Sequence, residues 1–250
     1  MMESTMPKVS IIVLAYDSLH YLVRTIESYL SNTAYENYEM IISHNPCGNK
    51  EIEDAIESVS KIWIENSDNN FKYIRNPTNI YHGPGIMAGM NLVNEDTKYV
   101  VLSNDDVFIP GSQEKWLSKL VDFLEKNPKV MSVTPSLYSE KETVYWIGKQ
   151  DPKQPHHDFL HVAKGDPILP KNPISSCYNN FAICLVRKNL IDEFKIGISC
   201  PHYGSDSEFY NRVKEKYPEM ESWVIPEIKL YHFNIFYKRI NHNKDKIVEG

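Results

Sequence analysis

The alternation of apolar runs with amphipathic segments over residues 8–135 constrains the fold more than any other feature of the sequence. Residues 9–15 form a nearly continuous apolar run, which is typical of a strand buried on both faces of a sheet. The next segment predicts an amphipathic helix, because its apolar residues recur at three or four positions: Leu19, Leu22, Val23, Ile26 and Leu30. The alternation continues with expected strands at 38–43, 71–75, 99–102 and 130–133, and expected helices at 52–62, 83–94 and 116–124.

This rhythm predicts an α/β fold. Strand–helix–strand units form right-handed crossovers, so we expect a Rossmann-like, mostly parallel central sheet with flanking helices. In such sheets the ligand lies beyond the carboxyl ends of the strands. Residues that directly follow each strand are therefore the first candidates for a functional site.

The second half of the sequence departs from this rhythm. Residues 149–173 contain five prolines and predict a long loop near the acceptor side of the site. Beyond it we expect strands at 181–187, 222–225 and 230–233 and helices at 188–194 and 205–217. The sequence therefore predicts one domain over 1–250, with a donor half at 8–135, a smaller acceptor-side half at 136–233 and a tail at 234–250.

Composition excludes several classes of protein. A chain of 250 residues with formal net charge -6 has no overall basic field, so a nucleic-acid partner is not expected. No apolar run approaches the ~18 residues that span a bilayer, and the first eight residues lack the pattern of a secretory signal. The four cysteines show no CxxC spacing, which favours reduced thiols. We expect a cytoplasmic protein without a transmembrane segment.

Three groups of polar residues stand out. Asn104, Asp105 and Asp106 follow an expected buried strand, and adjacent carboxylates there suit Mg²⁺ or Mn²⁺, although a polar turn has the same composition. Asp206 begins an expected helix, where acidic residues also occur simply because the helix dipole favours them. His232 lies among apolar residues, where a packed histidine is the common alternative. The loop histidines His156, His157 and His161 are expected to be solvated.

The ordered set of motifs resembles glycosyltransferase family 2, whose members have the GT-A fold. The resemblance covers about residues 8–233 and rests on the first strand with Tyr16-Asp17, the Asn- and Gly-rich segment 75–91, Asn104-Asp105-Asp106, the segment 204–209 and Tyr231-His232-Phe233. It implies that Asp105, with Asp106 and His232, binds a divalent cation, and that Asp206 is the general base. It also implies that the nucleotide-sugar donor is held by Ala15, Tyr16, Asp17, His44, Arg75 and Asn104.

The resemblance implies an inverting glycosyltransferase that moves a sugar from a nucleotide-sugar donor to an acceptor hydroxyl. The donor would be a UDP-, GDP- or dTDP-sugar, and the acceptor a glycan, a lipid-linked saccharide or a protein. Where the family usually has an aspartate that contacts the base, this sequence has a turn from Ser43 to Pro46 without a carboxylate, so the base is not assigned. Two alternatives stay open: a nucleotidyltransferase acting on a sugar phosphate, and a non-catalytic carbohydrate-binding protein on the same fold.

Overall fold

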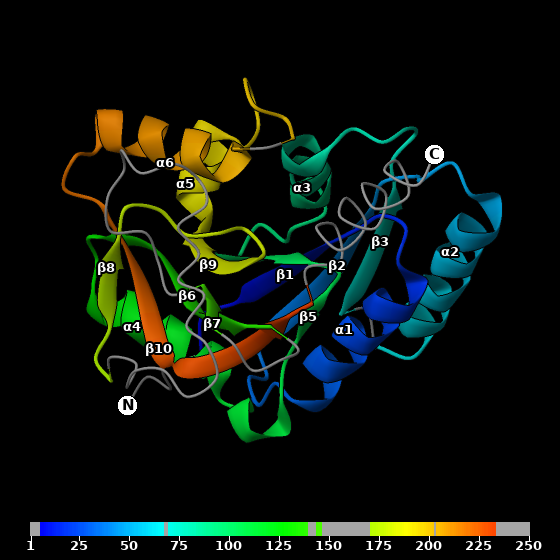
Figure 1. Ribbon diagram of the computed structural model, residues 1–250, viewed down its shortest axis with the longest axis horizontal. Coiled ribbons are helices and arrows are strands. Elements are labelled where there is room, and N and C mark those ends of the chain that lie inside the picture. Colours follow the sequence, from blue (N-terminus) through cyan, green and yellow to red (C-terminus); the bar gives the residue numbers. More distant parts are fainter. Residues whose placement is uncertain (1–5, 68–69, 140–143, 147–170, 203, 234–250) are drawn as a thin grey trace, which may run out of the picture.

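The computed structural model describes residues 6–67, 70–139, 144–146, 171–202 and 204–233 (Figure 1). Most of the expected loop at 149–173, its three histidines and the tail at 234–250 lie outside these ranges. Within them, no helix is both long enough and apolar enough to cross a membrane.

A single mixed sheet forms the centre of the molecule, in the order β3-β2-β1-β4-β9-β6-β10-β5, with β7 paired to β6 and β8 paired to β10. Its strands are β1 (Val9–Ala15), β2 (Tyr38–His44), β3 (Phe71–Arg75), β4 (Tyr99–Asn104), β5 (Val107–Phe108), β6 (Val130–Tyr138), β7 (Val144–Trp146), β8 (Ile174–Ser176), β9 (Ile183–Arg187) and β10 (Glu221–His232). The first four pair in parallel, as the donor half of the sequence predicts.

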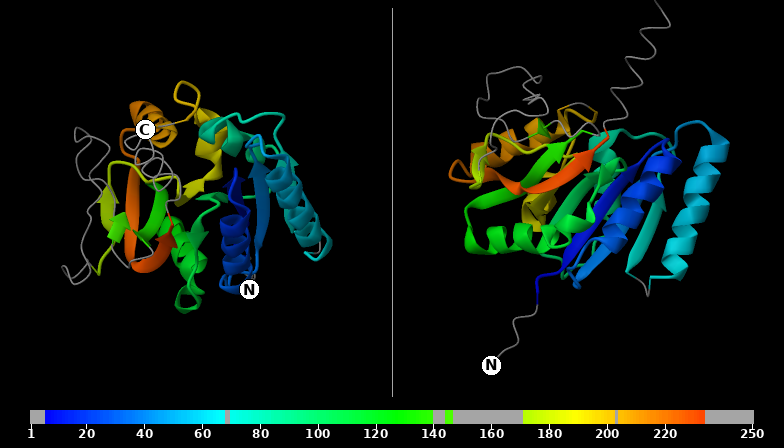
Figure 2. Two further views of the ribbon diagram at one scale, coloured as in Figure 1. Left: turned by 45° about the vertical axis from the view of Figure 1, so that its right-hand side comes forward. Right: turned by 60° about the horizontal axis from the view of Figure 1, so that its bottom comes forward.

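Helices cover both faces of this sheet (Figure 2). They are α1 (Leu19–Ser31), α2 (Lys50–Glu65), α3 (His82–Met90), α4 (Trp116–Lys126), α5 (Lys188–Phe194) and α6 (Ser205–Lys216), with a 3-10 turn at Gly111–Gln113. Alternate residues of β1 separate two cores: Ile11 and Val13 pack with α1, α2 and α4, whereas Ile12 packs with α3, α5 and α6. The continuous apolar run of β1 is therefore buried on both sides, which confirms the expected α/β fold class.

The rest of the sheet is less regular than the sequence suggests. β9 runs antiparallel to both β4 and β6, so the parallel arrangement holds for β3-β2-β1-β4 and for the β6–β10 pair. The two short strands expected at 222–225 and 230–233 are one strand, β10, whose register shifts between Ile225 and Lys229. β5 and β8, of two and three residues, were not predicted because such short strands carry no periodicity.

Candidate active site

Most of the residues expected to hold a donor lie at the carboxyl edge of the parallel strands. Ala15 at the end of β1 is in register with His44 at the end of β2, and His44 is in register with Arg75 at the end of β3. On the other side of β1, Leu14 is in register with Asn104, the last residue of β4. Tyr16 and Asp17 follow β1 directly. The shared edge of the sheet brings together four segments that are far apart in sequence.

Asp105 lies immediately beyond β4 and joins that strand to the loop after β1. One of its carboxylate oxygens, Oδ2, accepts a hydrogen bond from the backbone N–H of Tyr16 at 3.1 Å. The hydroxyl of Thr25 on α1 donates to the backbone carbonyl of Asp105 at 2.9 Å. Burial raises the pKa of Asp105 to about 8, and the nearby carboxylates of Asp106 and Asp17 add to the rise. It is therefore energetically unfavourable for Asp105, Asp106 and Asp17 to be ionised together here without a compensating cation.

Asp106 and His232 meet through the pairing of two strands that lie more than a hundred residues apart in sequence. β5 pairs antiparallel with the end of β10, and the backbone N–H of Phe233 donates to the carbonyl of Asp106 at 3.0 Å. The imidazole Nε2 of His232 lies 3.0 Å from Oδ1 of Asp106, and both side chains are buried. The close approach of His232 to this acidic segment is what the resemblance leads one to expect.

The chemistry of these side chains suits a hard divalent cation, although they do not form a closed cage. Among the residues that the structure describes, no three His, Cys, Asp or Glu side chains are placed to hold a metal ion. Asp105, Asp106 and His232 offer carboxylate oxygens and one imidazole nitrogen, which are ligands that Mg²⁺ or Mn²⁺ accepts. The remaining ligands would have to come from a bound molecule such as a diphosphate.

The side chains of His44 and Arg75 reach the same edge but are engaged elsewhere. Nδ1 of His44, which is fully buried, lies 2.9 Å from the hydroxyl of Tyr73. Burial lowers the pKa of His44, and the charge of Arg75 lowers it further. The guanidinium of Arg75 pairs with Glu53 at 2.5 Å and Glu57 at 3.4 Å, both on α2. Arg75 would have to exchange these partners to reach a ligand.

Asp206 lies in the first turn of α6, after Gly204 in the left-handed conformation (φ 80). Its Oδ1 accepts a hydrogen bond from the backbone N–H of Ser207 at 2.7 Å. Glu208 has a different set of contacts. Its two oxygens accept from the backbone N–H groups of Ser199 and Cys200 at 2.9 and 3.1 Å, so it ties the preceding loop to α6.

His82 was not predicted as a site residue, yet it links the two halves of the domain. Its Nδ1 lies 3.0 Å from the hydroxyl of Ser205, the residue before Asp206, and its side chain hydrogen-bonds that of Asn104 at the end of β4. Its ring stacks on Phe181, with centroids 6.4 Å apart. Burial lowers the pKa of His82 to about 4, so the imidazole is neutral at pH 7. The only sequence signal was its place beside Gly83 in the glycine-rich turn.

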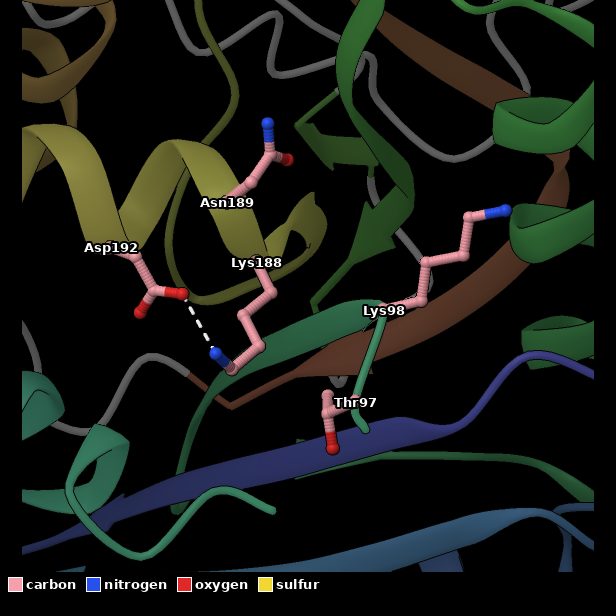
Figure 3. Close-up of a pocket in the computed structure, with 5 residues that line it drawn as sticks. All are labelled: Thr97, Lys98, Lys188, Asn189 and Asp192. Atoms are coloured by element: carbon pink, nitrogen blue, oxygen red, sulfur yellow. Dashed lines mark hydrogen bonds and ion pairs between the residues drawn. The ribbon is translucent and has the colours of Figure 1, made fainter. Parts of the chain in front are cut away.

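A hollow elsewhere on the molecule does not involve any of these residues. Thr97 and Lys98, which precede β4, line it together with Lys188, Asn189 and Asp192 of α5 (Figure 3). It therefore lies at the amino end of β4, opposite the edge described above. Both lysines are already paired, Lys98 with Glu125 at 2.7 Å and Lys188 with Asp192 at 2.7 Å.

Solved structures with a similar fold come from glycosyltransferases. The structure of GalNAc-T7 with UDP, GalNAc and Mn²⁺ superposes with a TM-score of 0.70 at 12% sequence identity, over 92% of this chain and 44% of that one. S. aureus TarS 1-349 superposes with a TM-score of 0.60 at 14% identity, over 90% of this chain and 60% of that one. At these identities the likeness establishes the fold, which is that of the GT-A enzymes.

Sequence relatives point the same way. An uncharacterized glycosyltransferase of Haemophilus influenzae is 29% identical over 227 residues, which are 85% of this chain and 64% of that protein. An uncharacterized protein of Sinorhizobium fredii, y4gI, is 34% identical over 140 residues, 55% of this chain and 14% of that protein. The chain thus spans less than two thirds of the length of these relatives. The model of the family described as Glycosyl transferase family 2 matches residues 10–192, well over half of the chain. The chain belongs to glycosyl transferase family 2.

Proposed function

We propose that this protein transfers a sugar from a nucleotide-sugar donor to an acceptor hydroxyl, with inversion and with the help of a divalent cation. The observation that carries the proposal is the acidic pair Asp105-Asp106 at the carboxyl edge of the sheet, with His232 brought against it by the β5–β10 pairing. Membership of the family supports sugar transfer over the nucleotidyl transfer that the same chemistry would also allow.

The charge distribution fits a leaving nucleoside diphosphate. A cation bound here would neutralise negative charge that develops on the diphosphate as the sugar departs. Asp105 and Asp106 supply the oxygen donors that such an ion needs, and His232 lies within contact distance of Asp106. Burial is the main reason that the pKa of Asp105 is raised, and the nearby carboxylates of Asp106 and Asp17 add to the rise, so a cation would favour the charged form of Asp105. Ala15, Tyr16 and Asp17 at the end of β1 would hold the nucleoside.

Asp206 is the proposed general base. Its carboxylate would accept the proton of the acceptor hydroxyl while that oxygen bonds to the anomeric carbon and the carbon–oxygen bond to the diphosphate breaks. Attack on the face opposite the leaving group inverts the anomeric carbon and requires no covalent enzyme intermediate. The hydrogen bond from Ser207 N–H orients the Asp206 carboxylate, and Glu208 holds the adjoining loop.

The donor class proposed first is a UDP-sugar. The similar structure of GalNAc-T7 was solved with UDP, GalNAc and Mn²⁺, and this chain shares its fold. GDP- and dTDP-sugars are the other candidates, and a glycan, a lipid-linked saccharide or a protein is the proposed acceptor.

Isothermal titration with UDP tests the metal role. We expect Mn²⁺-loaded protein to bind UDP much more tightly than protein in EDTA, because the ion would offset the negative charges of the diphosphate and of Asp105 and Asp106. Asp105→Asn should weaken binding in Mn²⁺ more than Asp106→Asn. Asp54→Asn, an exposed carboxylate paired with Lys50 on α2, is the control and should bind as the wild type does. The proposal would be contradicted if UDP, GDP and dTDP each bound with the same affinity in Mn²⁺ as in EDTA.

A further inference from the structure

Tyr81 adopts a backbone conformation that is essentially reserved for glycine. Its φ of 69 and ψ of -174 lie in a region that a Cβ atom makes unfavourable. Residues held there are strained, and such residues concentrate at functional sites. The sequence places an aromatic residue at this position, although glycine would adopt the same backbone without strain.

The contacts that hold the backbone of Tyr81 do not use its ring. Its carbonyl accepts hydrogen bonds from the side-chain amide of Asn45 at 2.9 Å and from the N–H of Gly85 at 3.1 Å. Its N–H donates to the side-chain oxygen of Asn79 at 3.0 Å. A glycine would keep every one of these bonds. These bonds give no reason for a tyrosine rather than a glycine at this position, so the contacts of the ring are the next question.

The ring of Tyr81 is half exposed and lies beside a second exposed ring. It stacks on the imidazole of His202, with centroids 5.4 Å apart and planes inclined by 26°, while 50% of Tyr81 remains accessible. The exposed parts of the two stacked rings combine apolar ring atoms with the polar tyrosine hydroxyl and imidazole nitrogens. We call Tyr81 and His202 the aromatic pair.

The aromatic pair is fixed to the segment that carries the proposed base. Gly83 donates its N–H to the carbonyl of Pro201 at 2.9 Å, next to His202. A Cβ atom on Gly83 would lie 2.5 Å from the Cα of Gly197, so the backbones of α3 and of the loop before α6 are in direct contact. His82, adjacent to Tyr81, reaches Ser205, the residue before Asp206.

We propose that the aromatic pair binds a pyranose ring by stacking against its apolar C–H face. This inference rests on the proposed sugar transfer and names where a sugar would lie. Tyrosine suits the role because it combines a large apolar face with a polar edge, as a sugar does. A pyranose is favoured over a nucleobase because the pair is anchored to the loop that leads to Asp206, whereas the nucleoside is assigned to the end of β1.

Ligand-detected NMR tests the aromatic pair directly. Saturation-transfer titrations would use the methyl β-glycosides of glucose, galactose, N-acetylglucosamine and N-acetylgalactosamine, with UDP and Mn²⁺ present. We expect at least one glycoside to bind wild-type protein and to bind roughly threefold to tenfold more weakly to Tyr81→Gly and His202→Ala, the usual scale of one aromatic contact. Tyr81→Phe keeps the apolar face of the ring and should lose less affinity than Tyr81→Gly. Glycoside signals that persist when UDP is bound would place the glycoside in the acceptor position. Glycoside signals that UDP-glucose displaces would place it in the position of the donor sugar.

Thermal unfolding separates this role from a structural one. Tyr81→Gly should raise Tm by about 2–4 °C because it removes backbone strain, even as glycoside binding falls. Glycoside binding unchanged in Tyr81→Gly would overturn the aromatic pair as a sugar site, whereas a lowered Tm would overturn only the argument from backbone strain. If Tyr81→Gly lost as much affinity for UDP as for the glycoside, the ring would contact the nucleobase, and the aromatic pair would not be a sugar site. If wild-type protein binds glycosides but no nucleoside diphosphate, the proposed transfer fails while the sugar site stands.

Discussion

Replacing His82 by glutamine should flatten the dependence of stability on pH between pH 7 and pH 4. The imidazole of His82 is packed against Phe181, its ring nitrogen contacts Ser205, and its other polar neighbour is Asn104. The nearby imidazole of His202 also disfavours a positive charge at this position. Burial is the main reason that the pKa in the folded protein is about 4, against 6.5 for an ordinary histidine.

The sign and size of the effect follow from proton linkage. Between pH 6.5 and about 4 the unfolded chain binds a proton at His82 that the folded chain does not, so stability is complete above pH 6.5 and falls as the pH is lowered. A difference of about 2.5 pKa units corresponds to about 3 kcal/mol of unfolding free energy. In a protein of this size that is about 6–12 °C in Tm.

Urea unfolding at pH 7, 6, 5 and 4 measures this difference. Other groups titrate over the same range in both proteins, so the informative quantity is the wild-type loss of stability minus that of His82→Gln. Glutamine retains a donor and an acceptor for Ser205 and Asn104, and it carries no proton to gain. Parallel pH profiles for the two proteins would show that His82 is not buried as a neutral imidazole, and the reasoning would be wrong.

Two further predictions concern the packing of α3 and the chemistry at α6. Gly83→Ala should destabilise the protein by roughly 1–3 kcal/mol, because its Cβ would lie 2.5 Å from the Gly197 backbone. Gly111→Ala, whose Cβ would have nothing nearer than 3.6 Å, is the control and should be nearly neutral. Equal urea midpoints for the two variants would refute the contact between Gly83 and Gly197. Asp206→Asn should lower the transfer rate by ~10²-fold or more with UDP affinity unchanged, and Glu208→Gln should be milder; a rate for Asp206→Asn near that of wild type would exclude it as the base.

The parallel strands β1 to β4 and the helices that pack against them were predictable because each carries its own local pattern. The apolar run at 9–15 and the stripes of α1, α2 and α4 specify element type locally, and the crossover rule then fixes the parallel pairing. The carboxyl-edge position of Ala15, His44, Arg75 and Asn104 follows from that pairing alone. Their side-chain partners do not follow from it, as the engagement of Arg75 by α2 shows.

Other features of the fold depend on contacts between residues distant in sequence. β5 has only two residues, and it forms by pairing with β10, so no local sequence pattern predicts it. The same holds for His82, whose partners Asn104 and Ser205 lie on β4 and α6. The resemblance to a family supplied His232 as a candidate, but its 3.0 Å approach to Asp106 could only be seen in three dimensions.

The β5–β10 pairing also bears on how the protein reaches its working form. The bond from Phe233 to Asp106 closes a loop of more than a hundred residues, and contacts of such long range are the costly ones in chain entropy. Every element from the 3-10 turn to α6 lies within that loop. Because a shorter flexible loop costs less entropy to close, order in these elements favours the approach of His232 to Asp106, and the completeness of the acidic site is thereby coupled to the stability of the segment between them.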